Sequence, residues 1–151
     1  MTDRFVLPLD RVGIEAIIPH RDPFLLIDEI TELVPGEHAV GRYHVDPDAW
    51  YLRGHFPGRP IMPGVLQVEA LAQVGAVCGL ASPGFAGRLA LFAGIDDVRF
   101  KRIVVPGDTL TLECRITRLR GPIGKADATA SVAGELACRA ALTFALTEQA
   151  P

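Results

Sequence analysis

Apolar side chains between residues 64 and 80 recur so densely that they point in nearly every direction around a helix. A helix of this length spans about 25 Å. Because it has no broad polar face, we expect it to be buried on most of its sides. Pro63 and Gly64 mark its start, since a proline in the first turn gives up no intrahelical hydrogen bond.

The strand pattern is clearest in residues 109–117, where polar and apolar side chains alternate. Such alternation is typical of a strand with one face on the core and one face in water. Other alternating or apolar stretches bounded by proline and glycine predict further strands, and a short helix is expected at 10–18. The expected strands are 25–34, 38–46, 88–94, 96–105, 109–119 and 124–146, the last divided by Gly134.

One long buried helix beside five to seven strands leaves few ways to form a core. The simplest wraps a curved, largely antiparallel sheet around the helix, which is an α+β fold. The prolines and glycines between Pro47 and Pro63 exclude regular helix or an internal strand, so this segment should be a shaped loop. The chain shows no internal repeat or linker, and we expect a single domain over residues 1–151.

Charge and apolar run lengths exclude several classes of function. The net charge of −3 provides no long-range attraction for nucleic acid. No apolar run reaches the ~20 residues that a membrane-spanning helix needs. Residues 1–10 lack the apolar core and cleavage site of a secretory signal, so we expect a cytoplasmic protein that does not bind membranes.

The three cysteines, Cys78, Cys114 and Cys138, lie far apart in apolar or alternating stretches. Neither a disulfide framework nor the paired spacing of a zinc site is present. We therefore expect these side chains to be inert packing residues, and we predict no metal site.

Glu69 is the first candidate for chemistry, because it lies within the apolar helix. Burial should raise the pKa of its carboxyl group. A carboxyl group that stays protonated near neutral pH can donate its proton to a leaving hydroxyl, which makes Glu69 a candidate general acid. The alternative is a structural role, with Glu69 bonded to Gln73 four residues further along the same helical face.

His55 is the second candidate, since it lies in the loop that precedes the helix. Histidine can accept a proton at neutral pH, and a loop made rigid by glycine and proline would hold the imidazole in place. We therefore predict that His55 is a general base. The alternative is an ordinary solvated loop histidine, and His20, His38 and His44 are weaker candidates for catalysis.

Gly64 completes the candidate site, because free N–H groups and partial positive charge gather at the start of a helix. Without a side chain at this position, a thioester carbonyl can approach the N–H closely. The N–H would then stabilise the oxyanion that forms when the adjacent carbon loses a proton. Base, acid and oxyanion donor are expected to converge.

The motif from His55 to Leu66, His-Phe-Pro-Gly-Arg-Pro-Ile-Met-Pro-Gly-Val-Leu, is followed by Glu-Ala-Leu-Ala-Gln at 69–73. Together they resemble the (3R)-3-hydroxyacyl-acyl-carrier-protein dehydratases of type II fatty acid synthesis. Flanking segments resemble the same family in the same order, so that the likeness spans most of the chain. They are Pro-His-Arg-Asp-Pro-Phe-Leu-Leu-Ile-Asp at 19–28, Phe-Ala-Gly-Ile-Asp at 92–96, Arg-Phe-Lys-Arg at 99–102 and Pro-Gly-Asp at 106–108.

The resemblance implies a hot-dog fold and a homodimer with two active sites at its interface, often assembled as a trimer of dimers. In such a dimer, His55 faces Glu69 of the partner chain. The resemblance further implies that His55 removes the C2 proton, Glu69 assists departure of the C3 hydroxyl, and the Gly64 N–H polarises the thioester carbonyl. No cofactor is required.

Acyl carrier protein, the partner that the resemblance implies, is acidic, and Arg99, Lys101 and Arg102 are candidate contacts for it. An ordinary solvated strand face is the alternative for these residues. An acyl tunnel could be lined by Phe24, Leu91 and Phe92, although such residues in strands also serve as plain core. The chain departs from the usual family pattern at Asp22, Leu91 and Asp97.

Four alternative functions compete with plain dehydration of fatty acyl intermediates. Relatives that also isomerise the double bond usually carry aspartate where this chain has Glu69, which favours the plain dehydratase. A hot-dog thioesterase would also place a carboxylate on the central helix, but the His55 loop favours dehydration. A dehydratase of a specialised polyketide or lipid pathway would keep the same pair. A catalytically silent carrier-binding subunit would be favoured if either residue were replaced.

Overall fold

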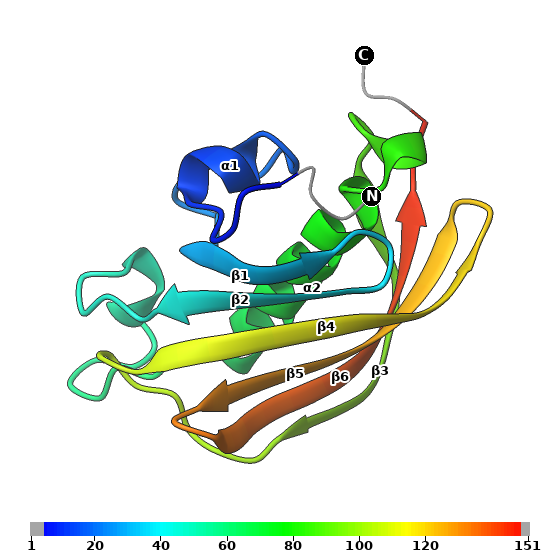
Figure 1. Cartoon of the computed structure of the whole chain (residues 1–151). Coiled ribbons are helices and arrows are strands. Elements are labelled where there is room, and N and C mark those ends of the chain that lie inside the picture. Colours follow the sequence, from blue (N-terminus) through cyan, green and yellow to red (C-terminus); the bar gives the residue numbers. More distant parts are fainter. Residues whose placement is uncertain (1–4, 149–151) are drawn as a thin grey trace.

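A six-stranded antiparallel sheet wraps around one long helix in the computed structural model, which describes residues 5–148 (Figure 1). The strand order across the sheet is β1-β2-β4-β5-β6-β3. The strands are β1 (Glu29–Val34), β2 (His38–His44), β3 (Ala90–Phe100), β4 (Thr109–Arg120), β5 (Ile123–Val132) and β6 (Glu135–Leu146), and the helices are α1 (Arg11–Glu15) and α2 (Gly64–Leu80). Short 3-10 turns occupy Trp50–Leu52 and Pro83–Phe85. The architecture confirms the expected hot-dog fold.

Helix α2 has the bounds that the apolar pattern predicts, and most of its residues are buried. It runs across the sheet behind β1, β2 and β4 in the view of Figure 1. The sheet approaches α2 closely because glycine stands at the contacts. A Cβ at Gly75 would lie 2.9 Å from Cys114 Sγ on β4, and a Cβ at Gly41 on β2 would lie 3.1 Å from Val74 Cγ2. The helix therefore forms the centre of the core.

The predicted strand at 25–34 is wrong in its first part, because β1 begins only at Glu29. Leu25, Leu26 and Ile27 are fully buried without belonging to a strand. The Leu26 N–H donates to Gln73 Oε1, and the Leu25 carbonyl accepts from Arg11 while its N–H donates to the Arg21 carbonyl of the preceding turn. A short buried apolar run has no period that separates a strand from irregular chain, which explains the error.

The two strands predicted at 88–94 and 96–105 are one strand, β3, and residues 101–105 lie outside it. Its pairing with β6 shifts register between Phe92 and Gly94 and again between Asp96 and Arg99. Asp97 lies in the second irregular stretch with φ of 52°, a left-handed conformation that aspartate tolerates better than most residues. These irregularities break the alternation in the sequence without ending the strand.

The remaining predicted elements are confirmed, with shifted ends. The short helix at 10–18 shrinks to α1, whose Asp10 side chain accepts a hydrogen bond from the Gly13 N–H at the helix start. The stretch 124–146 is divided as expected, because Ala133 and Gly134 both have positive φ, 50° and 83°, as a two-residue hairpin turn requires. All three cysteines are buried and unpaired, in agreement with a packing role.

Residues 5–148 contain no helix that is both long and apolar enough to cross a membrane. The prediction about a secretory signal concerns residues 1–10, and residues 1–4 of that segment lie outside the part of the chain that the structure describes.

Candidate active site

Glu69 lies on the buried part of α2, and its side chain is 17% exposed. Burial raises the pKa of this carboxyl group, while a hydrogen bond from Gln73 acts in the opposite, weaker direction. The Gln73 Nε2 group donates to Glu69 Oε2 at 2.9 Å. The sequence predicted a raised pKa for an acid role and, as the alternative, a bond to Gln73 for a structural role. The structure contains both features at once. Glu69 is thus a carboxyl group biased toward its protonated form.

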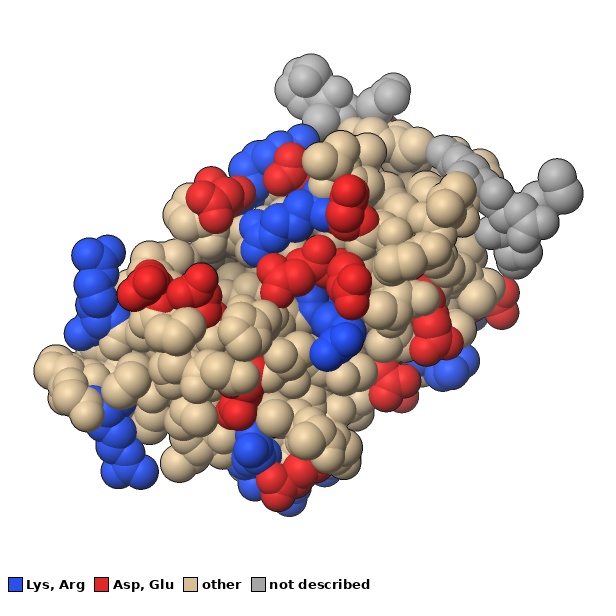
Figure 2. All heavy atoms as spheres, turned by 60° about the vertical axis from the view of Figure 1, so that its left-hand side comes forward, with Lys and Arg blue, Asp and Glu red and all other residues tan. Residues whose placement is uncertain are grey.

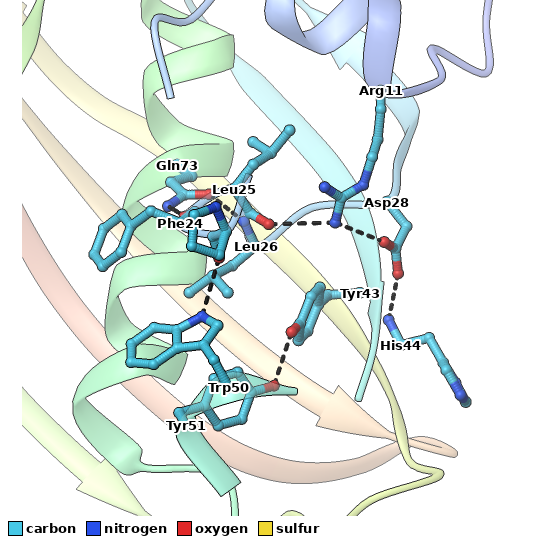
Figure 3. A network of polar contacts seen from close by, with 11 residues as sticks. Arg11, Phe24, Leu25, Leu26, Asp28, Tyr43, His44, Trp50, Tyr51 and Gln73 are labelled. Atoms are coloured by element: carbon cyan, nitrogen blue, oxygen red, sulfur yellow. Dashed lines mark hydrogen bonds and ion pairs between the residues drawn. The ribbon is translucent and has the colours of Figure 1, made fainter. Parts of the chain in front are cut away.

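Gln73 connects Glu69 to the chain segment that precedes β1, and Figure 3 shows its bonds to that segment. Its Nε2 also donates to the Phe24 carbonyl at 2.8 Å, and its Oε1 accepts from the Leu26 N–H at 2.7 Å. Gln73 itself is only 1% exposed. Its side-chain amide therefore holds Glu69 and the irregular segment 23–28 in one network, and it occupies the Leu26 N–H that strand pairing would use.

The same segment is anchored from three other elements, as Figure 3 shows. Arg11 on α1 donates to the Leu25 carbonyl at 3.3 Å and to Asp28 Oδ1 at 3.1 Å. Asp28 Oδ2 accepts from the backbone N–H of His44 on β2 at 2.6 Å. Trp50 Nε1 donates to the Pro23 carbonyl at 3.1 Å. Four side chains thus position the backbone that carries Phe24 toward Glu69.

A cavity of about 240 Å³ opens between α2 and the sheet beside Glu69. The three predicted tunnel residues all line it, Phe24 from the anchored segment and Leu91 and Phe92 from β3. Its other walls are mostly apolar and include Cys114, Leu142 and Phe144. A single carboxyl group in an apolar cavity is a suitable environment for a general acid.

His55 lies in the loop before α2, and a single contact determines its tautomer. Its Nδ1 is 2.8 Å from the Ile61 carbonyl oxygen. Because a carbonyl can only accept, Nδ1 carries the proton in the neutral ring and Nε2 keeps a free lone pair. The Ile61 N–H donates back to the His55 carbonyl at 2.8 Å, and the imidazole stacks on Phe56 at 4.1 Å between ring centroids. The ring is fixed in the state that a general base requires.

The structure brings His55 together with Gly64, since both line an open groove of about 420 Å³. Phe100 of β3 lines the same groove. A Cβ at Gly64 would lie 2.6 Å from Phe100 Cε1, so packing against this ring also requires glycine, a reason that the sequence did not show. Within residues 5–148, no group accepts a hydrogen bond from the Gly64 N–H.

The structure does not bring His55 and Glu69 together within one chain. Glu69 lines the cavity beside α2, His55 lines the groove at the start of α2, and neither residue lines the other's space. The predicted convergence of base, acid and oxyanion donor is therefore incomplete in a single chain, where only the base and the oxyanion donor meet.

His20 is a residue of this region that sequence reasoning undervalued. Its Nε2 lies 3.7 Å from Glu69 Oε2, and it lines the cavity of Glu69. Burial, followed by the neighbouring charge of Arg21, lowers the pKa of the His20 imidazole. Because His20 and Glu69 are 49 positions apart, no local spacing points to their contact; only the position of His20 in the Pro-His-Arg motif offered a signal.

The predicted carrier contacts are not equivalent in the structure. Arg102 is paired with Glu135 at 2.6 Å and with Asp108 at 3.2 Å, which leaves little of its charge for a partner. Arg99 and Lys101 are exposed, and Lys101 and Arg102 line the groove of His55. On the face that Figure 2 shows, basic and acidic side chains are interspersed.

Within residues 5–148, no group of three or more histidine, cysteine, aspartate and glutamate side chains is arranged to hold a metal ion.

Comparison with known proteins identifies the family of this chain. The model of the family described as the FabA-like domain matches residues 18–141. A 3-hydroxyacyl-[acyl-carrier-protein] dehydratase FabZ from Chloroflexus aggregans is 60% identical over 89% of this chain and 94% of its own length. Proteins of the same name from Moorella thermoacetica and Bacillus velezensis are 54% and 57% identical, each over 93% of this chain and 99% of its own length.

Two solved structures share the fold at low sequence identity. One is a dehydratase heterocomplex, ApeI:P, from Xenorhabdus doucetiae, with a TM-score of 0.78, 18% identity and coverage of 95% of this chain and 93% of that chain. The other is a hypothetical thioesterase with coenzyme A from Streptococcus pneumoniae, with a TM-score of 0.62, 15% identity and coverage of 82% and 90%. Identities this low support the fold alone.

Proposed function

This chain belongs to the FabA-like family, and we propose that it is a 3-hydroxyacyl-[acyl-carrier-protein] dehydratase of fatty acid biosynthesis, with His55 and Glu69 as its base and acid. It converts a 3-hydroxyacyl thioester on acyl carrier protein to the trans-2-enoyl thioester and water. The observation that carries this conclusion is the 60% identity to a dehydratase over 94% of that relative's length. The geometry of the two side chains supplies a mechanism.

The reaction moves two protons and breaks one carbon–oxygen bond. His55 Nε2 takes the C2 proton, and the electron pair left behind delocalises onto the thioester oxygen, which the Gly64 N–H stabilises. The electron pair then forms the C2–C3 double bond as the C3–O bond breaks. The leaving hydroxyl takes the proton of Glu69 and departs as water. Transfer of one proton from His55 to Glu69 through solvent restores both groups.

The competing activities have weaker support. The hypothetical thioesterase of Streptococcus pneumoniae shares the fold at 15% identity, whereas the dehydratases are 54 to 60% identical to this chain. Both His55 and Glu69 are present, which disfavours a silent subunit. Isomerase activity stays the less favoured prediction, because residue 69 is glutamate. A specialised pathway would keep the same reaction and change the acyl chain.

The test is to incubate the purified protein with 3-hydroxyacyl-acyl-carrier-protein and to follow the product by mass spectrometry. Loss of one water from the wild type, but not from His55→Ala or Glu69→Gln, is the expected result. Release of a free acid would instead identify a thioesterase. Recovery of unchanged substrate from the wild type would contradict the assigned activity.

The edge strand β3 supports a homodimer. Within the described chain it pairs only with β6, and its other edge is left open. Large apolar side chains are exposed along it, which a lone protein in water would have to solvate. These side chains are Leu91, Phe92, Ile95 and Phe100. We propose that β3 pairs with β3 of a second copy, so that the sheet continues across the interface.

A two-fold axis through this pairing would complete the active site. Leu91 and Phe92, near the start of β3, line the Glu69 cavity, whereas Phe100, at its end, lines the His55 groove. Antiparallel pairing sets the start of one β3 beside the end of the other. The cavity of Glu69 then faces the partner's His55. The separation of the two residues in one chain is the observation that supports this proposal.

Mixing inactive variants tests the shared site. His55→Ala and Glu69→Gln chains, unfolded and refolded together, should regain about one quarter of wild-type activity, because half of the random dimers would contain one intact site of two. Each variant refolded alone is the control. An absence of recovery, with mixed dimers demonstrated by mass spectrometry, would contradict a site built from two chains.

Further features of the assembly are proposed on the same basis. Phe24, Leu91 and Phe92 would line the acyl tunnel, and Arg99 and Lys101 would contact acyl carrier protein with less help from the paired Arg102. A trimer of dimers stays a prediction from the resemblance.

One continuous core from Leu9 to Leu146 supports a single domain. The three unpaired thiols are consistent with a reducing cytoplasm.

A further inference from the structure

The two oxygens of Glu69 have different surroundings. Oε2 accepts the Gln73 Nε2 hydrogen bond at 2.9 Å and lies 3.7 Å from His20 Nε2. Oε1 has no hydrogen-bond partner within residues 5–148, and it is not among the buried polar atoms that lack one. Oε1 is therefore the oxygen that remains open to the cavity.

The tautomer of His20 follows from its other nitrogen. Nδ1 of His20 is buried and has no partner among the described residues. A buried N–H without an acceptor costs more than a buried lone pair without a donor, so the neutral ring places its proton on Nε2. That N–H points to the side of Glu69. A doubly protonated ring would leave the Nδ1–H without an acceptor, so the site favours the neutral form.

The backbone of His20 is held so that its ring stays beside Glu69. Arg21 Nη1 donates to the His20 carbonyl at 2.7 Å and to the Ile18 carbonyl at 2.9 Å. Its Nη2 donates to the Glu15 carbonyl at 3.1 Å, at the end of α1. The side chain of His20 is 23% exposed. The guanidinium of Arg21 thus holds the turn that carries His20 through three backbone carbonyls.

We propose that His20 is a positioning residue for Glu69: the Gln73 amide holds Oε2 as an acceptor, so that the acid proton stays on Oε1, and the His20 Nε2–H joins Oε2 as that proton leaves. A carboxylic acid carries its proton on one oxygen, and the Gln73 donor bonded to Oε2 disfavours the proton there. Oε1–H then faces the cavity, where the C3 hydroxyl of the substrate leaves. The inference rests on the proposed dehydratase function and assigns His20 a part in it.

The separation of 3.7 Å is too long for a hydrogen bond in the resting protein. As Glu69 gives up its proton, negative charge grows on both oxygens, and the Nε2–H of His20 is attracted to Oε2. Contacts of this kind tighten in the transition state, where they lower the barrier more than they stabilise the bound substrate. The role of His20 should therefore appear in kcat and not in KM.

Three variants test whether the hydrogen-bond donor of His20, and not its imidazole ring as such, supports Glu69. His20→Leu removes the donor and should lower kcat about ten- to a hundredfold, the usual effect of one hydrogen bond to a charged group, with KM nearly unchanged. His20→Gln keeps an N–H at similar reach and should recover most of that loss. His38→Leu is the matched control, because the His38 side chain on β2 is 24% exposed, close to the 23% of His20, and lines neither the Glu69 cavity nor the His55 groove. This variant should keep wild-type kcat.

The result that would overturn the role is wild-type kcat in His20→Leu, or a loss in His20→Gln as large as in His20→Leu. A ¹⁵N spectrum of the wild-type imidazoles, with His20 assigned by its absence in folded His20→Gln, tests the tautomer independently of the kinetics. The Nε2–H form is expected, and an Nδ1–H form would overturn the proposal. Wild-type protein that dehydrates no substrate would overturn the proposed function as well.

Discussion

The acid half and the base half of the candidate site are built by opposite means. Glu69 lies on a regular helix, and a glutamine that is 1% exposed binds it to a distant segment of chain. His55 lies in an irregular loop, and the Ile61 carbonyl and the stacked Phe56 ring of that same loop fix its imidazole. Burial raises the pKa of the acid, whereas the half-buried loop leaves Nε2 of the base accessible. The environment of Glu69 thus favours its protonated form, whereas the contact with Ile61 sets the tautomer of His55.

If His55 and Glu69 each transfer one proton, loss of either side chain should lower kcat by a similar factor. His55→Ala and Glu69→Gln should each lower kcat about 10² to 10⁴-fold, because each removes one proton transfer by a positioned side chain. Steady-state kinetics with circular dichroism of both variants measures this. Near-normal turnover in either folded variant would remove that residue from the mechanism.

Substitutions beside Glu69 and beside His55 should differ in how much they lower the free energy of unfolding. Gln73→Leu would leave the Leu26 N–H and the Phe24 carbonyl without partners in a buried place, and should lower the free energy of unfolding by about 3 kcal/mol. Phe56→Ala, in the loop of His55, removes a ring that is 50% exposed and should cost less than about 1 kcal/mol. Urea denaturation of both variants tests the difference, and equal losses would contradict it.

The pH dependence of stability should carry the signature of Glu69. Because the folded state raises the pKa of this carboxyl, folding favours the protonated form, and its contribution to stability is lost as pH rises from 4.5, the ordinary value, through the raised pKa. Glu69→Gln cannot ionise and should melt at a higher temperature than the wild type at mildly alkaline pH. Below pH 4.5 the two melting temperatures should be close. A Glu69→Gln variant that is less stable at alkaline pH would reverse the assigned direction.

The smallest effect is expected at the rim of the base half. Lys101→Ala should raise KM for the carrier-bound substrate a few-fold, with kcat unchanged, because an exposed charge contributes less than about 1 kcal/mol. Added salt should reduce the difference from the wild type. Arg118→Ala, on an exposed part of β4, is the control. An unchanged KM at low salt would remove Lys101 from the carrier contact.

Local patterns predicted those parts of the fold that depend on neighbouring residues. The bounds of α2 were correct, since the dense apolar run, Pro63 and Gly64 act within a few turns. The division of residues 124–146 at Gly134 was correct for the same reason. The strand predicted at 25–28 and the break predicted within β3 were wrong, because side-chain bonds to Gln73 and the shifted pairing with β6 are decided by distant residues.

The candidate site divides in the same way. His55, Glu69 and Gln73 could be identified from residue type, spacing and the helix that carries two of them. The contact of His20 with Glu69 could not, since folding alone brings these residues together across 48 intervening positions. The packing of Phe100 against Gly64 was equally hidden.

The sequence by itself determined the candidate reacting groups, the family and the central helix, because residue chemistry and short-range periodicity are written along the chain. Only the tertiary structure decided that Glu69 and His55 occupy separate cavities and that β3 is an open apolar edge between them. Both results depend on which distant surfaces cover one another. Burial and the pairing of strand edges are properties of the folded chain, and no local pattern records them.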